Sequence, residues 1–128
     1  MTFEINNGLI SPAYWLPSAN FTARPDPDDI SLLVIHNISL PPGEFGGGFV
    51  QAFFQNQLDS SIHPYFASIA HMQVSAHCFI DRAGALTQFV SLGHRAWHAV
   101  VSDFAVRGYC NDFSIGVELD CTDDIAYT

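Results

Sequence analysis

The sequence contains no lysine, and its four cationic side chains are all arginines. With a formal net charge of −9 over 128 residues, the chain lacks the basic surface that binding to nucleic acid or to an anionic membrane requires. We therefore expect neither nucleic acid nor a membrane as a partner.

Leader-like and membrane-spanning segments are also missing from the sequence. No apolar run is long enough to span a bilayer. The N-terminal stretch MTFEINNGLI carries an acidic residue and lacks the cationic start of a secretory signal. These features predict a cytoplasmic protein, while nothing in the sequence predicts its oligomeric state.

Cysteine is scarce, and its spacing does not suggest a metal site. Cys78, Cys110 and Cys121 are odd in number and show no paired CxxC spacing. This argues against a disulfide framework and against a four-thiolate zinc site. Buried free thiols are the remaining interpretation.

The chain has enough apolar residues for one globular domain over residues 1–128, since 48% of them are hydrophobic. Residues 1–30 hold four of the seven prolines and are predicted to be an irregular lead-in. The apolar run at residues 32–35 predicts a central strand buried on both faces, and residues 49–58 predict an amphipathic helix. A β-hairpin that turns at DRAG is predicted over residues 74–90.

The order of these elements predicts an α/β (α+β) domain with a mixed central β-sheet and helices packed on it. A last strand is predicted at residues 114–119, and only the tail DCTDDIAYT follows it. One face of the sheet is therefore expected to carry a helix, with too little chain left to cover the other face.

Histidine is abundant, with six in the chain, but none of the spacings is HExxH. A catalytic zinc needs three protein ligands around an open position, so spacing alone selects no ligand set. A single histidine is more often a hydrogen-bonded, half-buried residue. His71 and His77, which flank a predicted strand start, are expected to pack or to form hydrogen bonds there.

Glu118 is the strongest candidate for acid–base chemistry from the pattern alone. Strand alternation places it with Ser114 and Gly116, opposite the apolar set, which leaves room beside it for a substrate or a water. An ordinary exposed strand glutamate explains the pattern equally well. Nucleophilic catalysis has less support, because no GxSxG elbow is present and no cysteine lies in an electropositive sequence context.

Several longer motifs carry a resemblance to a known family. In chain order they are LLVIHNISLPPGEFGG, IAHMQVSAHCFIDRAG, RAWHA, CNDFSIGVEL and TDDIAYT. Together they resemble the type 2 N-acetylmuramoyl-L-alanine amidases, in particular the zinc amidases of peptidoglycan recycling. That family shares its fold with the peptidoglycan recognition proteins and with phage lysozymes of the amidase type. The resemblance covers nearly the whole chain from Ile30 onward.

The resemblance implies an activity and a set of site residues. The activity is zinc-dependent hydrolysis of the amide bond between anhydro-N-acetylmuramic acid and L-alanine, with an anhydromuropeptide as substrate and Zn²⁺ as cofactor. His36 falls on a zinc ligand and Glu118 on the catalytic glutamate, which takes a proton from the zinc-bound water. Asn37 and Trp97 fall in the substrate pocket.

The chain also departs from the family pattern. The family's second histidine ligand, its aspartate ligand and a catalytic lysine lie in a C-terminal segment after AYT, together with helices that cover the sheet. The chain therefore resembles a C-terminally truncated amidase domain, which we expect to be inactive alone. Two arginines that bind the peptide's carboxylates in the family fall on Gln73 and Tyr109, and Arg107 lies near enough in sequence to compensate.

Two alternatives to an active amidase follow from these departures. One is a non-catalytic module that binds muropeptides, although Gln73 and Tyr109 weaken that interpretation. The other is a truncated gene product without a function of its own.

Overall fold

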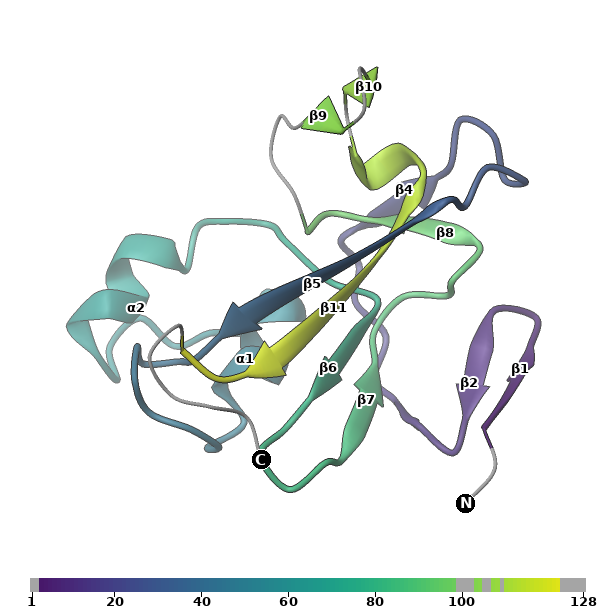
Figure 1. Ribbon diagram of the computed structural model, residues 1–128. Coiled ribbons are helices and arrows are strands. Elements are labelled where there is room, and N and C mark those ends of the chain that lie inside the picture. Colours follow the sequence, from purple (N-terminus) through teal and green to yellow (C-terminus); the bar gives the residue numbers. More distant parts are fainter. Residues whose placement is uncertain (1–2, 99–102, 105–106, 109, 123–128) are drawn as a thin grey trace.

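The computed structural model describes residues 3–98, 103–104, 107–108 and 110–122. A mixed five-stranded sheet in the order β3-β7-β6-β11-β5 forms its centre (Figure 1). The strands of this sheet are β3 (Tyr14–Trp15), β5 (Leu32–Ile38), β6 (Cys78–Ile80), β7 (Leu86–Gln88) and β11 (Ser114–Asp120). Only the β6–β7 pair of this sheet is antiparallel, which confirms both the mixed sheet and the hairpin that turns at DRAG.

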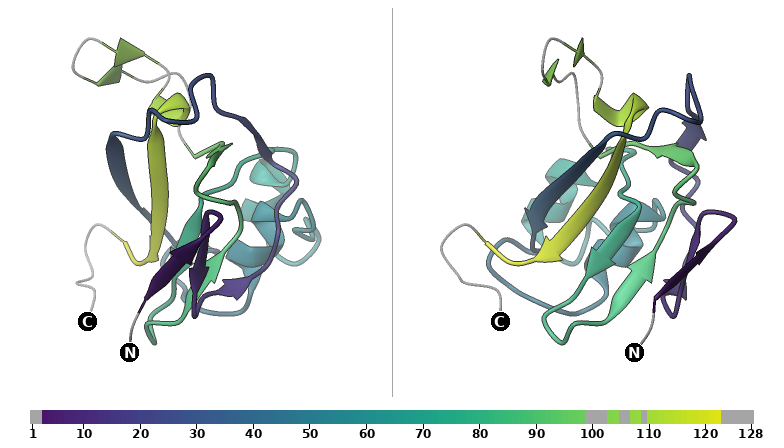
Figure 2. Two further views of the ribbon diagram at one scale, coloured as in Figure 1. Left: turned by 90° about the vertical axis from the view of Figure 1, so that its right-hand side faces the viewer. Right: turned by 45° about the vertical axis from the view of Figure 1, so that its right-hand side comes forward.

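Two short helices, α1 (Phe49–Phe54) and α2 (Pro64–Ile69), pack on one face of the sheet (Figures 1 and 2). Their phenylalanines build the core together with sheet residues; the largest members are Phe53, Phe54, Phe66, Phe79 and Phe89. Helix α1 is shorter than the predicted 49–58, because Asn56 adopts a left-handed φ of 60° just beyond it. Helix α2 was not predicted. His63 caps it by accepting a hydrogen bond from the Tyr65 amide.

The opposite face of strand β5 is uncovered among the described residues. The side chains of Leu33 and Ile35 are 61% and 53% exposed. The prediction of a central strand buried on both faces is therefore wrong: β5 pairs with β11 on one side only, at the edge of the sheet (Figure 2). Within the described residues, one face of the sheet is therefore not covered by a helix at β5, as the sequence predicted.

The N-terminal region is not the irregular lead-in that its prolines predicted. It forms a hairpin of β1 (Glu4–Asn6) and β2 (Leu9–Ser11), and β4 (Phe21–Ala23) pairs with β8 (His94–Ala96). The hairpin turns at Asn7 and Gly8, whose φ angles are 52° and 80°. An Asn-Gly pair between two short strands is a strong hairpin signal, and here it outweighs the prolines that follow.

The remaining described elements lie between β8 and β11. They are β9 (Asp103–Phe104), β10 (Arg107–Gly108) and the 3-10 helix η1 (Cys110–Asp112). The predicted buried thiols are confirmed, since all three cysteines are buried and none forms a disulfide. Within the described ranges, no helix has the length and apolarity to cross a membrane.

Candidate functional site

The parallel pairing of β5 with β11 sets the candidate site. In this register the Cα of Glu118 lies opposite the Cα of His36. Residues paired in register on neighbouring strands point to the same side of a sheet. The implied zinc ligand and the implied catalytic glutamate, which are far apart in sequence, are thus brought together.

Glu118 is a buried carboxyl group rather than the exposed strand glutamate that the alternation also allowed. The residue is only 8% exposed. Its Oε2 atom is buried and has no hydrogen-bond partner among the described residues. Burial raises the pKa of the Glu118 carboxyl to about 8. A buried, unpartnered oxygen with a raised pKa is typical of a functional position rather than of a structural one.

The His36 ring contacts a second histidine, His98, which follows strand β8. The Nε2 atom of His36 lies 3.1 Å from Nδ1 of His98, and the two rings meet edge-on with centroids 5.3 Å apart. The other nitrogen of His98, Nε2, lies 2.8 Å from the Ser114 hydroxyl oxygen. Ser114, His98 and His36 therefore form a continuous hydrogen-bonded chain.

Gly116 makes the space that the His98 ring occupies. A Cβ atom at Gly116 would lie 2.5 Å from Cγ and Cδ2 of His98. No real Cβ tolerates so short a contact with a ring, so any larger residue at this position would displace His98. The small residue that alternation had placed beside Glu118 thus has a specific packing role.

Both imidazoles of the pair are held in their neutral form. Burial lowers the pKa of His36, and burial together with neighbouring His36 lowers the pKa of His98 to about 3. A neutral imidazole is the form that binds a metal ion.

The described residues do not complete a zinc site by themselves. Among them, no group of three histidine, cysteine, aspartate or glutamate side chains is placed to hold a metal ion. Catalytic zinc sites use three protein ligands. His36 fits the role of one ligand, and the remaining ligands are not found in this part of the chain.

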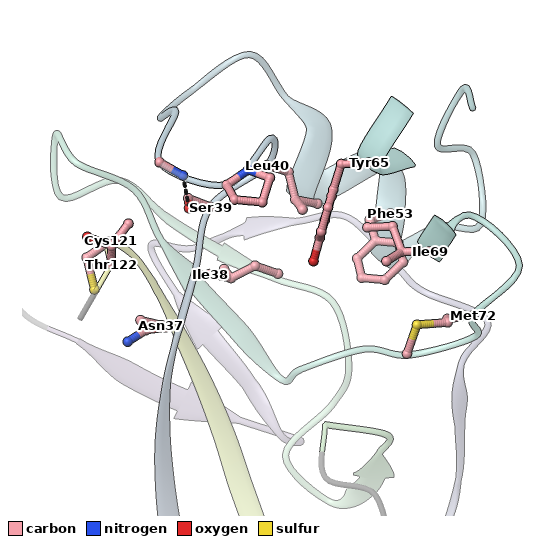
Figure 3. A pocket seen from close by; sticks show the side chains of 12 residues that line it. Asn37, Ile38, Ser39, Leu40, Phe53, Tyr65, Ile69, Met72, Cys121 and Thr122 are labelled. Atoms are coloured by element: carbon pink, nitrogen blue, oxygen red, sulfur yellow. Dashed lines mark hydrogen bonds between the residues drawn. The ribbon is translucent and has the colours of Figure 1, made fainter. Parts of the chain in front are cut away.

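A cavity of about 450 Å³ opens beside the C-terminal end of β5 (Figure 3). Asn37 lines it, together with residues of the loop after β5, the two helices and the end of β11; these include Ile38, Leu40, Phe53, Tyr65, Ile69, Met72 and Thr122. The Tyr65 hydroxyl points into the cavity (Figure 3). Sequence reasoning missed Tyr65, because it lies on the short helix α2 that the pattern did not reveal.

The other predicted substrate residues lie elsewhere. Trp97 does not line this cavity: its indole N–H is directed to the Thr22 hydroxyl, 3.5 Å away. Gln73 is exposed in the loop between α2 and β6. Arg107 begins strand β10, and Tyr109 lies outside the described residues.

Comparison with known proteins places these features in a family context. A family model described as N-acetylmuramoyl-L-alanine amidase matches residues 26–128, which include both β5 and β11. The 1,6-anhydro-N-acetylmuramyl-L-alanine amidase AmpD of Haemophilus influenzae is 54% identical over 125 residues, covering 98% of this chain and 68% of the relative. The protein of the same name from Escherichia coli is 52% identical over 124 residues, covering 97% of this chain and 68% of the relative.

Two solved structures are also similar, each at 53% sequence identity. The crystal structure of a selenomethionine derivative of AmpD gives a TM-score of 0.95 and covers 98% of this chain and 70% of that one. The solution structure of Citrobacter freundii AmpD gives a TM-score of 0.63, with 98% of this chain and 67% of that one covered. The present chain spans about two thirds of the length of these relatives.

Proposed function

Since this chain belongs to the N-acetylmuramoyl-L-alanine amidase family, we propose that it is a muropeptide amidase domain of peptidoglycan recycling. The bond hydrolysed is the amide between (anhydro-)N-acetylmuramic acid and L-alanine, and the reaction takes place in the cytoplasm. The observation that carries the proposal is the parallel register of β5 and β11, which pairs Glu118 with His36 on one side of the sheet.

Zinc is the proposed cofactor, with His36 as one of its ligands. The half-buried, neutral imidazole of His36 suits this role, and the further ligands must come from outside the described residues. When bound, zinc supplies a Lewis acid that polarises the amide carbonyl and lowers the pKa of a water molecule.

Glu118 is proposed to carry the proton transfer. In its ionised form, Glu118 would accept a proton from the attacking water through the unpartnered Oε2 atom and pass it to the leaving amine of L-alanine. Because burial favours the protonated carboxyl group, this role requires that a bound cation favour the carboxylate. Burial of Glu118 keeps bulk water away from the carboxyl group, and the His98 ring fills the space at Gly116.

The substrate is proposed to bind in the cavity beside β5. Asn37 supplies an amide that donates and accepts hydrogen bonds, and Tyr65 supplies a hydroxyl. Trp97 and Arg107 are proposed as further substrate contacts on the strength of the family resemblance. Gln73 and Tyr109 stand where the family has arginines, so we expect weaker binding of the peptide's carboxylates.

We expect the 128-residue chain alone to be inactive, because its described residues do not complete the zinc ligands. A chimera tests the proposal: the chain is joined to the part of the Haemophilus influenzae relative that lies beyond the match. With zinc, the chimera should release L-alanyl peptide from an anhydromuropeptide, measured by liquid chromatography. Glu118→Gln and His36→Ala should each lower its turnover at least about 100-fold.

His71→Ala, a change at an exposed histidine, is the matched control and should leave turnover unchanged. An active Glu118→Gln chimera would contradict the proposed role of the carboxyl group. Activity of the unextended chain would contradict the proposed lack of ligands.

Muropeptide binding without hydrolysis is the second candidate function. It is favoured by the cavity beside β5, whose lining does not include the proposed zinc ligand His36 or the proposed catalytic Glu118. Calorimetric titration of the 128-residue chain with a muropeptide in the presence of a chelator separates the two functions. Binding that is lost in Asn37→Ala but retained in Glu118→Gln would support a binding module.

A further inference from the structure

The contact with His98 restricts how His36 can bind a metal. The contact to His98 is the only hydrogen bond of the His36 side chain within the described residues, and it uses Nε2. A neutral imidazole has one N–H and one lone pair. If Nε2 accepted a hydrogen from His98, Nδ1 would carry the ring's own hydrogen and no lone pair would remain for a metal.

Only one direction of the hydrogen bond leaves His36 able to act as a ligand. In that direction Nε2–H of His36 donates to Nδ1 of His98, and the lone pair of His36 lies on Nδ1. His98 must then carry its own hydrogen on Nε2, which donates to the Ser114 hydroxyl oxygen 2.8 Å away. Each partner in the chain is able to accept the hydrogen that this direction requires. The reverse direction, in which the Ser114 hydroxyl donates to His98 and His98 donates to His36, fits the same distances but leaves His36 without a lone pair for a metal.

We propose that His98 is a positioning residue that holds His36 in the Nε2–H tautomer and leaves Nδ1 open to zinc, with Ser114 fixing the His98 ring in turn. The inference rests on the proposed role of His36 as a zinc ligand. Partners that bind the second nitrogen of a ligating histidine fix its tautomer and ring orientation, and their loss typically weakens metal binding about 10- to 100-fold.

The packing around His98 supports a positioning role. The ring is seated over Gly116, where a Cβ would come within 2.5 Å of it. Ser114 is fully buried, at 0% exposure, so its hydroxyl is a fixed partner rather than a solvent-exposed one. A residue that only filled space would need neither a partner at each ring nitrogen nor a glycine beneath it.

The test reads the tautomer directly and needs neither zinc nor activity. Long-range proton–nitrogen NMR spectra of the ¹⁵N-labelled 128-residue chain at neutral pH distinguish protonated from unprotonated ring nitrogens. Signals are assigned by their loss in His36→Ala. We expect His36 as the Nε2–H tautomer in the wild type and a mixture of tautomers in His98→Phe.

A conservative variant and a matched control complete the experiment. His98→Asn places an amide oxygen near the position of Nδ1, so it should restore the single tautomer that His98→Phe loses. Gly116→Ala should displace His98 and therefore give the same mixture of His36 tautomers as His98→Phe. His94→Phe changes an exposed ring that stacks on Phe21, and it should leave His36 unaffected.

The inference is overturned if wild-type His36 carries its hydrogen on Nδ1, or if its tautomer is the same in His98→Phe. A zinc titration of the same sample tests separately whether His36 binds zinc, as the proposed function requires. A single Nε2–H tautomer that depends on His98 supports the inference even when zinc leaves Nδ1 of His36 unperturbed, and that result would count against His36 as a ligand.

Discussion

Two buried polar clusters lie against strand β11, and they differ in how completely their hydrogen bonds are satisfied. The first, the Arg24 cluster, consists of Arg24 and His77 with their backbone partners. The second, the site cluster, consists of His36, His98 and Glu118. Both contact Ser114, whose carbonyl accepts from Arg24 and whose hydroxyl oxygen meets His98.

The Arg24 cluster is a structural network in which most groups have partners; its exception among the described residues is the buried Nε atom of Arg24, which has none. The guanidinium of Arg24 donates to four backbone carbonyls, those of Leu92, Asn111, Asp112 and Ser114, at 2.8 to 3.3 Å. The His77 ring is fully buried. Its Nδ1 accepts from the Gly116 amide at 3.1 Å, and its Nε2–H donates to the His94 carbonyl at 2.8 Å.

The site cluster leaves the Oε2 atom of Glu118 buried without a partner among the described residues. An unpartnered buried polar atom destabilises a fold. For Arg24 Nε, the four hydrogen bonds made by the other two guanidinium nitrogens offset that cost. The comparison teaches that two clusters of similar residue types on one strand can serve different purposes. We propose that the Arg24 cluster stabilises the domain and that the site cluster keeps groups available for chemistry.

Among the predictions that test this contrast, the removal of Arg24 should have the largest effect on stability. Arg24→Met keeps an apolar stem but leaves four carbonyls without their charged donor. We expect the free energy of unfolding to fall by more than about 3 kcal/mol, measured by urea denaturation.

The control for this prediction is Arg95→Ala. Arg95 forms an ion pair with Asp112 in which the two side chains are 31% and 30% exposed. Its removal should change the free energy of unfolding by less than about 1 kcal/mol, because water screens such pairs. Equal losses in the two variants would break the assignment of a structural role to the Arg24 cluster.

The next largest effect should be a loss of stability at low pH that is caused by His77. Burial lowers the pKa of His77 to about 4 from its ordinary 6.5, so protonation disfavours the folded state. The stability that neutral His77 provides is complete above pH 6.5 and is lost as pH falls from 6.5 towards 4, by about 3 kcal/mol in total. Urea denaturation across this range should show that loss.

His77→Asn isolates this contribution, because its side-chain oxygen can still accept from the Gly116 amide while no group titrates. The difference in unfolding free energy between wild type and variant should shrink as the pH falls. If the unfolding free energies of the two proteins changed with pH in the same way, His77 would not be the cause of the pH dependence.

Glu118→Gln should have a smaller effect of opposite sign. The pKa of Glu118 is raised from 4.5 to about 8, so the wild type loses stability as pH rises through that window. The variant does not ionise. After an allowance of about 1.5 kcal/mol for burying an amide, the variant should be more stable than the wild type by about 1 to 2 kcal/mol at pH 7 and less stable by about the same amount near pH 4, where the wild-type carboxyl group is uncharged in both states.

Thermal unfolding at several pH values measures this difference. Glu4→Gln, at an exposed position, is the control and should be neutral. A destabilised Glu118→Gln at pH 7 would show that the carboxyl group is structural, and the contrast between the two clusters would fail.

Sequence reasoning proposed His36 and Glu118 for the candidate site but not most of the residues around them. His36 and Glu118 followed from the motifs, and alternation alone placed Glu118 with Ser114 and Gly116. Arg24 was missed, because its neighbours along the chain are turn residues whereas its partners lie in Leu92 and residues 111–114. Tyr65 was missed because it lies on the short helix α2, which the pattern did not reveal.

The sequence by itself determined local properties of this protein: the period-two pattern of β11, the DRAG hairpin, the buried thiols and the family to which the motifs belong. These depend on neighbours a few residues away, so the pattern is enough to predict them. Only the tertiary structure decided that β5 is an edge strand, that Glu118 faces His36 and that His98 rests over Gly116. Such pairings depend on strand order and register between segments far apart in the chain, which no local pattern specifies.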